Sequence, residues 1–194
     1  MNIDIESIKD RLSHTLSPHR YLHSLATAAE AQRLARHWGV NEAKAYLAGL
    51  LHDSAKNYSP EEMLSLASLH NIATDEWELA HPDILHGPVA AAMLQETWGI
   101  EDMEVAEAIR LHTIPQGEMS DLAKIIFLAD KIEPNRKPWP GIDVLRSLAY
   151  QNLDQAIEAM LRSNIGFLAK RSDQIHPSTQ EIWQIYRNKI KDLG

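Results

Sequence analysis

The sequence predicts an all-α protein, and three observations along its 194 residues support this fold class. Apolar residues recur at helical spacing, as in Leu22, Leu25, Ala26 and Ala29. Helix-capping motifs and helix-stopping glycines alternate along the chain. No stretch alternates apolar and polar residues as a half-buried strand does. We therefore expect one helical bundle over residues 1–194, with a helical extension at its C-terminal side.

The boundaries of several helices can be predicted from their capping residues. Ser17 and Ser59 each precede a proline, which favours the first helical position, and Ser59 also begins a Ser-x-x-Glu capping box. Ser120 precedes an acidic residue that the helix dipole favours. Gly39 and Gly99, each after a tryptophan, are predicted helix ends. The least helical segments are predicted at Asn71–Asp83, Ile114–Gly117 and Pro134–Gly141.

Composition excludes several classes of function. The net charge of −8, without a run of lysine or arginine, disfavours binding to duplex nucleic acid. The absence of cysteine excludes disulfides, thiolate metal sites and a cysteine nucleophile. Apolar runs are too short to cross a membrane, and the first residues do not resemble a secretory signal, so we expect a cytoplasmic location. A phosphorylated ligand remains compatible, because a metal ion and a few basic groups reverse the local field.

Two segments of the chain share a histidine pattern. The segment from His23 to His52 and the segment from His86 to His112 each contain a Trp-Gly pair, and the second histidine follows the tryptophan by 14 residues in both. Each segment is predicted to form an antiparallel helix pair with its two histidines at the open end. Four histidines should then gather at one end of a bundle, whether the pattern reflects duplication or chance recurrence.

Adjacent metal-binding side chains end an apolar helix at His52 and Asp53. Burying either one without a partner is costly. His23 can add a third ligand, and Asp130 ends a second apolar run, where a carboxylate needs a cationic partner. Taken singly, each residue is better explained as a capping carboxylate or a hydrogen-bonded core histidine. Together they predict a mixed imidazole and carboxylate site, which suits iron, manganese, zinc or cobalt better than magnesium or calcium.

The order His23, His52-Asp53, Asp130 resembles the HD superfamily of metal-dependent phosphohydrolases. A closer resemblance, over nearly the whole chain, is to the YqeK family of bacterial symmetrical diadenosine tetraphosphatases. The eight residues from Ala129 to Arg136 discriminate best, because a generic HD domain shares only their aspartate. The stretches that carry the resemblance are His23-Ser24, Ala48-Gly49-Leu50-Leu51-His52-Asp53-Ser54-Ala55-Lys56, Leu85-His86-Gly87-Pro88, Ile109-Arg110-Leu111-His112-Thr113 and Ala129-Asp130-Lys131-Ile132-Glu133-Pro134-Asn135-Arg136.

The resemblance implies roles for individual residues. It implies a divalent metal, iron with manganese, cobalt or zinc as alternatives, bound by His23, His52, Asp53 and Asp130. It implies catalytic roles for Asp53, His86, His112 and Asp130, in which the two histidines hold a second metal or donate a proton to the leaving group. Contacts with substrate are implied for His23, Asp53, Ser54, Lys56, His86, His112, Asp130, Arg136, Gln174, Ile175 and His176.

The implied reaction is hydrolysis of diadenosine tetraphosphate in the middle, giving two ADP. The expected partners are a dinucleoside polyphosphate or an ADP-like nucleotide, and a second copy of the chain in a homodimer. Two alternatives stay open: another HD-type nucleotide phosphohydrolase, such as a nucleotidase or a nucleoside triphosphate hydrolase, and a non-catalytic sensor of metal and nucleotide. Trp139, in a proline-rich stretch, is expected either to line the nucleotide site or to form a subunit contact.

Overall fold

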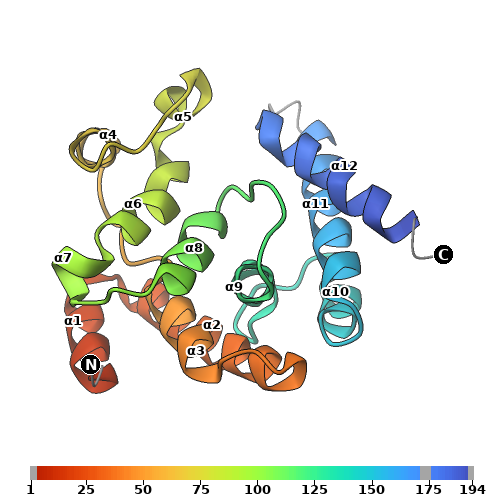
Figure 1. Ribbon diagram of the computed structural model, residues 1–194, viewed down its shortest axis with the longest axis horizontal. Helices are drawn as coiled ribbons and strands as arrows, with labels where there is room; N and C mark the ends of the chain where they lie inside the picture. Colours follow the sequence, from red (N-terminus) through yellow and green to blue (C-terminus); the bar gives the residue numbers. More distant parts are fainter. Residues whose placement is uncertain (1–3, 171–175, 192–194) are drawn as a thin grey trace.

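The computed structural model describes residues 4–170 and 176–191, and within these ranges it is helical, with no β-strand (Figure 1). The predicted all-α fold is confirmed. None of the helices in these ranges has the length and apolar character that a membrane span requires. The elements are α1 (Ile5–Thr15), α2 (Pro18–Trp38), α3 (Glu42–Leu51), α4 (Pro60–Leu69), α5 (Glu76–Ala80), the 3-10 helix η1 (Pro82–Leu85), α6 (His86–Ala92), α7 (Leu94–Trp98), α8 (Met103–Leu111), α9 (Asp121–Ile132), α10 (Ile142–Ala149), α11 (Leu153–Lys170) and α12 (Pro177–Lys191).

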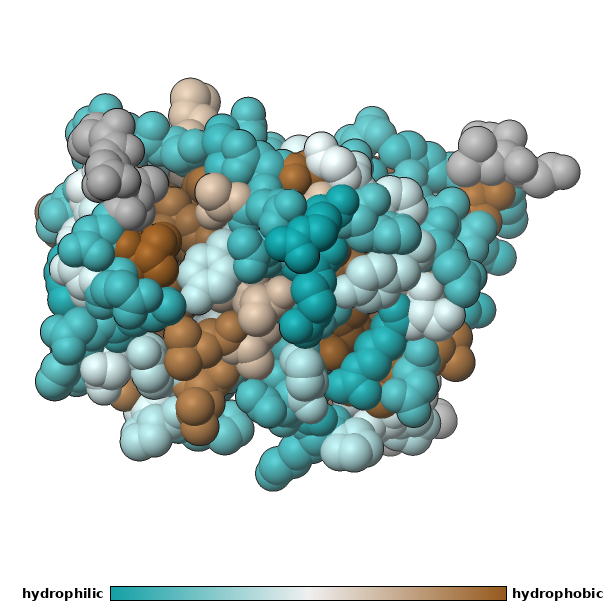
Figure 2. Space-filling view, turned by 90° about the horizontal axis from the view of Figure 1, so that it is seen from below, coloured by the Kyte–Doolittle hydropathy of each residue, from teal (hydrophilic) through white to brown (hydrophobic). Residues whose placement is uncertain are grey.

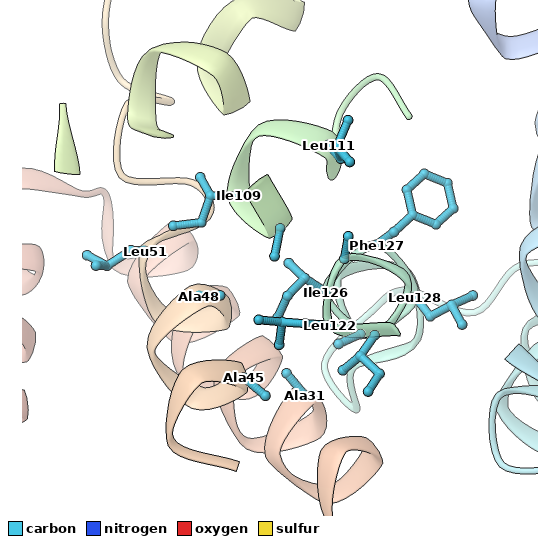
Figure 3. Close-up of a cluster of buried hydrophobic side chains, with 14 of the residues drawn as sticks. Ala31, Ala45, Ala48, Leu51, Ile109, Leu111, Leu122, Ile126, Phe127 and Leu128 are labelled. Atoms are coloured by element: carbon cyan, nitrogen blue, oxygen red, sulfur yellow. The ribbon is translucent and has the colours of Figure 1, made fainter. Parts of the chain in front are cut away.

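Helix α9 is the centre of the core and packs against α2, α3, α8, α10 and α11 (Figure 1). Its residues from Leu122 to Ala129 are all buried, and the one charged residue among them, Lys124, pairs with Asp121 and Asp154. The close-up in Figure 3 shows its side chains meeting those of α3 and α8. Asp130 lies in the last turns of the same helix, so its carboxylate is also in the interior, where the residue is 4% exposed.

Helix boundaries follow the predicted caps. The hydroxyls of Ser17, Ser59 and Ser120 each accept a hydrogen bond from a backbone N–H in the first turn of α2, α4 and α9. Gly39 and Gly99 end α2 and α7 in the left-handed conformation, with φ of 68° and 65°. These conformations disfavour a side chain, so glycine at both positions stops the helix at low cost.

One predicted loop contains helical structure. The segment 71–83 holds α5 and the start of η1. Asp75 and Glu78 form a reciprocal capping box, which stabilises the single turn of α5 among the turn-forming residues around it. The segments 114–117 and 134–141 are irregular, as predicted.

The last three helices cover α9 on the side away from α3 and α8 (Figure 1). Helix α11 packs on α9, and α12 packs on α11. Tyr186 of α12 is fully buried, and its hydroxyl accepts a hydrogen bond from the Met119 backbone N–H. Figure 2 shows the lower face of the molecule, where hydrophilic residues surround the apolar patches.

Candidate metal centre

Six buried polar side chains from distant parts of the chain meet beside α9, and we call them the His-Asp cluster. Each is at most 7% exposed. The rings of the four histidines are neighbours, with centroids 4.9–5.1 Å apart along the series. This arrangement agrees with the predicted hairpins, whose open ends meet at one place. The cluster comprises His23, His52, Asp53, His86, His112 and Asp130.

Backbone carbonyl groups fix the orientation of three histidine rings. In His52, His86 and His112, the ring Nδ1 lies 2.6–2.7 Å from the carbonyl oxygen of the residue three positions earlier. A carbonyl oxygen only accepts hydrogen bonds, so Nδ1 of His52 and His112 carries the proton and donates it. Nε2 of each ring then points its lone pair into the cluster. The ring of His23 is oriented differently, by the Glu133 carboxylate, 3.1 Å from Nδ1.

The inward nitrogen atoms suit a cation. Nε2 of His23 lies 3.2 Å from Nε2 of His52, and the corresponding atoms of His86 and His112 are also 3.2 Å apart. Two lone pairs at this distance repel each other unless a proton or a metal ion lies between them. Donor atoms fall into two groups, each within 4.8 Å: His23, His52 and Asp130, and His52, Asp53 and His112. Imidazole and carboxylate donors of this kind fit iron, manganese, cobalt or zinc.

Protonation states in the cluster also suit metal binding. Burial lowers the pKa of His52 to about 4 and lowers that of His112 as well, so both rings are neutral near pH 7, as ligands must be. Burial alone would raise the pKa of Asp53, but the surrounding imidazoles, that of His52 above all and those of His112 and His86, outweigh burial and hold it below its ordinary value. For Asp130, neighbouring charges in turn hold the pKa well below its ordinary value. Both carboxylates are therefore ionised.

Basic side chains surround these carboxylates. Arg20 Nη1 lies 2.8 Å from Asp53 Oδ2, and Lys131 Nζ lies 2.6 Å from Asp130 Oδ2. The Arg136 guanidinium pairs with the other oxygen of Asp130, and its Nε donates to the Asp130 carbonyl at 2.6 Å. Positive charge therefore balances the carboxylates and extends toward solvent.

A hollow of about 250 Å³ opens over this arrangement, and we call it the histidine-side hollow. Lys56 lies on its wall, with Nζ 3.1 Å from Nδ1 of His86, and burial lowers the pKa of this lysine. Basic groups and imidazoles around a small hollow are complementary to phosphate groups. The basic groups and imidazoles that line the hollow are those of Arg20, Lys56, His86, His112, Lys131 and Arg136.

Comparison with known proteins identifies the family. The HD domain family matches residues 20–135. The chain is 40% identical to the symmetrical bis(5'-nucleosyl)-tetraphosphatase of Halalkalibacterium halodurans, over 84% of this chain and 87% of that protein. It is 34% identical to the Staphylococcus aureus protein of the same name, over 98% and 100%. The chain belongs to the YqeK-like family of HD-domain proteins.

A solved structure agrees with this membership. A Clostridium acetobutylicum protein, described as a predicted HD superfamily hydrolase involved in NAD metabolism, superposes with a TM-score of 0.92 at 31% identity. The superposition covers 96% of this chain and 98% of the other. The YqeK-like fold therefore includes α10–α12, which follow the residues that match the HD domain.

Three residues that contact the His-Asp cluster of this YqeK-like chain were not identified from the sequence: Arg20, Lys131 and Glu133. Arg20 stands three residues before His23, on the same face of α2, which is a recognisable spacing. Lys131 and Glu133 lie within the stretch from Ala129 to Arg136. Lys131 contacts the neighbouring Asp130, whereas only the packing of α9 against α2 shows that Glu133 contacts His23.

Other predicted site residues lie elsewhere or outside the described ranges. Ser54 lines a separate hollow of about 320 Å³, beside Arg11 and Trp98, because the turn after α3 directs it away from Asp53. The ring of His176 packs nearly perpendicular to that of Trp77 in α5, with centroids 5.8 Å apart. Gln174 and Ile175 lie outside the described residues.

Proposed function

We propose that this protein is a metal-dependent hydrolase that cleaves diadenosine tetraphosphate symmetrically into two ADP. The observation that carries the proposal is the buried His-Asp cluster, which lies under a cationic hollow. The chain also aligns over almost its full length with a protein named as a symmetrical bis(5'-nucleosyl)-tetraphosphatase. The cluster accounts for hydrolysis, and the name of the relatives indicates the substrate.

The residues would divide the chemistry as follows. The metal would be held by His23, His52, Asp53 and Asp130. His112 would be a further ligand in the group that it forms with His52 and Asp53. A divalent metal at this position would supply positive charge to the phosphate oxygens and favour loss of a proton from water. Asp53 and Asp130 are poor proton acceptors near pH 7, because their pKa values are lowered, so they act as ligands and hydrogen-bond acceptors.

The phosphates would bind through the basic groups of the histidine-side hollow. Lys56 and Arg136 contact phosphate oxygens, and the planar guanidinium can bind two of them at once. His86, on the hollow wall, hydrogen bonds to the phosphate that becomes the leaving group. Water adds its oxygen to one central phosphorus, the bridging oxygen leaves with the bonding electron pair on the second ADP, and two protons are released to solvent.

Three finer assignments are also proposals: iron as the metal and a homodimer, which rest on the family resemblance, and a cytoplasmic location, which rests on the absence of cysteine. Elemental analysis of protein purified without added metal tests the first, and light scattering during size-exclusion chromatography tests the second. Zinc or manganese at full occupancy, or a monomer at all concentrations, would contradict them.

Products identify the reaction. Purified protein is incubated with diadenosine tetraphosphate in heavy-oxygen water, and the nucleotides are separated by mass. We expect ADP as the only nucleotide, with one heavy oxygen in half of the molecules, because water attacks one of two equivalent phosphorus atoms. ATP with AMP as the dominant pair would contradict the proposal. Faster hydrolysis of mononucleotides in a parallel panel would favour a nucleotidase or nucleoside triphosphate hydrolase instead.

A further inference from the structure

A second hollow, of about 450 Å³, borders the His-Asp cluster on the side of Trp139, and we call it the tryptophan-side hollow. His23 of the cluster lies on its wall. Lys131 and Arg136 line both this hollow and the histidine-side hollow, and both of these cations contact Asp130. The two hollows therefore meet over the same pair of positive charges, directly above a candidate metal ligand.

The two hollows differ in size and chemistry. The histidine-side hollow is the smaller, at 250 Å³ against 450 Å³, and basic groups and imidazoles dominate its wall. The tryptophan-side hollow adds an indole ring, a thioether and an amide, from Trp139, Met160 and Asn164. The same three residues also line an adjoining hollow of about 560 Å³, so the space continues beyond the indole. An aromatic face with a nearby amide is the combination that binds a nucleobase.

The indole of Trp139 has a defined position at this boundary. A Cβ atom on Gly141 would lie 3.2 Å from Cζ3 of the ring, so the ring is folded back against Gly141. The ring also packs partly against the hydrophobic core. A stacking surface that is already fixed loses little conformational entropy when a ligand binds.

We propose that the tryptophan-side hollow binds the second ADP half of the dinucleotide, with its base stacked on Trp139 and hydrogen bonded to Asn164. This inference rests on the proposed function. A central cut places one ADP on each side of the reacting phosphates, so the halves must leave the His-Asp cluster in two directions. The histidine-side hollow accounts for one direction, and the tryptophan-side hollow accounts for the other. Lys131 and Arg136, shared by both, then bind the central phosphates.

A substrate that lacks the second base tests the proposal. Adenosine 5'-tetraphosphate has the same four phosphates as diadenosine tetraphosphate but only one nucleoside. We expect the wild-type protein to show a KM about ten-fold lower for the dinucleotide, the advantage of one base stacked on an aromatic ring. In Trp139→Ala the two KM values should converge, and Trp139→Phe should restore most of the difference. Equal KM values in the wild type, or a ratio unchanged in Trp139→Ala, would overturn the proposal.

Binding of ADP gives a readout that does not depend on turnover. Equilibrium dialysis of the metal-loaded protein should find two ADP per chain in the wild type and one in Trp139→Ala. One ADP per chain in both proteins, or two in both, would overturn the second site. Protein that binds two ADP but does not hydrolyse the dinucleotide would contradict the proposed function and leave the second site standing.

A matched variant separates loss of binding from loss of packing. Trp98 is also partly buried against the core, but it lines the separate hollow beside Ser54, which shares no residue with the cluster. Trp98→Ala should keep the wild-type KM ratio and bind two ADP, even where its melting temperature falls as far as that of Trp139→Ala. A KM ratio that falls equally in both variants would overturn the specific role of Trp139.

Discussion

Two helical hairpins supply five of the six cluster residues, and they are built differently. The first hairpin, α2–α3, begins with an unbroken helix of 21 residues. In the second hairpin, α6–α8, the first limb is interrupted at Met93 and divides into the short helices α6 and α7. Both turn at a Trp-Gly pair, and both end in a histidine whose Nδ1 donates to the carbonyl three residues earlier.

Both hairpins also have a glycine where their limbs cross. A Cβ on Gly49 would lie 2.8 Å from the Cα of Ala28, and a Cβ on Gly87 would lie 3.0 Å from the carbonyl oxygen of Ile109. Close contact at the histidine end is therefore common to the two hairpins, whereas limb length is not. This comparison indicates that the crossing, and not the length of the helices, determines where the imidazoles lie.

The second histidines of the two hairpins differ in the number of donor groups to which they belong, and this difference predicts unequal effects on metal binding. His52 of the first hairpin belongs to both donor groups, whereas His112 of the second belongs to one. We expect His52→Ala to lose all bound metal and to reduce turnover on the order of a thousandfold or more. His112→Ala should retain metal at the group that contains His23 and Asp130. Elemental analysis and turnover of both variants measure the difference.

A histidine outside the cluster serves as the control. His37 lies on the first hairpin, and its Nε2 contacts the carbonyl of Tyr150. His37→Ala should keep its metal. Full metal occupancy in the double variant His52→Ala/Asp53→Ala would contradict the assignment of ligands, and equal loss in His52→Ala and His112→Ala would contradict the predicted inequality of the hairpins.

A basic side chain lies beside each hairpin, and substituting it should have a smaller effect, on KM and not on metal content. Arg136 contacts Asp130 beside the first hairpin, and Lys56 contacts His86 of the second. Arg136→Lys removes the two-pronged contact while keeping the charge, so we expect KM for diadenosine tetraphosphate to rise about ten-fold with metal content unchanged. Arg36→Lys, at an exposed pair with Glu42, is the matched control. Wild-type kinetics in Arg136→Lys would assign Arg136 to a structural role.

The sequence predicts the elements of this comparison better than it predicts their contacts. Capping residues such as Ser59 and helix-ending glycines act locally, so the helix boundaries follow from a few neighbouring residues. The single turn of α5 was missed because its capping box lies among turn-forming residues. Ser54 and Asp53 are neighbours in sequence but line different hollows, since a tight turn sends successive side chains in different directions.

Ion pairs across the fold are the least predictable part of the site. Arg20 and Glu133 are ordinary charged residues in the sequence. The role of Arg20 depends on how α2 packs against α3, and that of Glu133 on how α2 packs against α9. Glu133 is 2% exposed and orients His23 across 110 residues of chain. No local pattern indicates such a partner, whereas His52, Asp53 and Asp130 stand out because each follows an apolar run in the sequence.

The glycine crossings predict the smallest effect and test the comparison itself. Gly49→Ala places its Cβ against the backbone of Ala28, which cannot move without separating α2 from α3. Gly87→Ala first meets Oγ1 of Thr113, a side-chain atom that can rotate, and then the Ile109 carbonyl oxygen at 3.0 Å. We expect Gly49→Ala to reduce the free energy of unfolding by about 1–3 kcal/mol, and Gly87→Ala by less. Denaturant unfolding measures both.

Gly166 in α11 is the control for these two variants, because a Cβ there meets nothing within 4 Å. Gly166→Ala should leave the free energy of unfolding unchanged or raise it by about 0.5–1 kcal/mol, since alanine favours the helix. The metal affinity of these variants is measured as well. Gly49→Ala should bind metal more weakly, because separating α2 from α3 moves His52 away from His23. If Gly49→Ala is as stable as Gly166→Ala and keeps its metal affinity, close crossing does not position the histidines, and helix length must be reconsidered as the determinant.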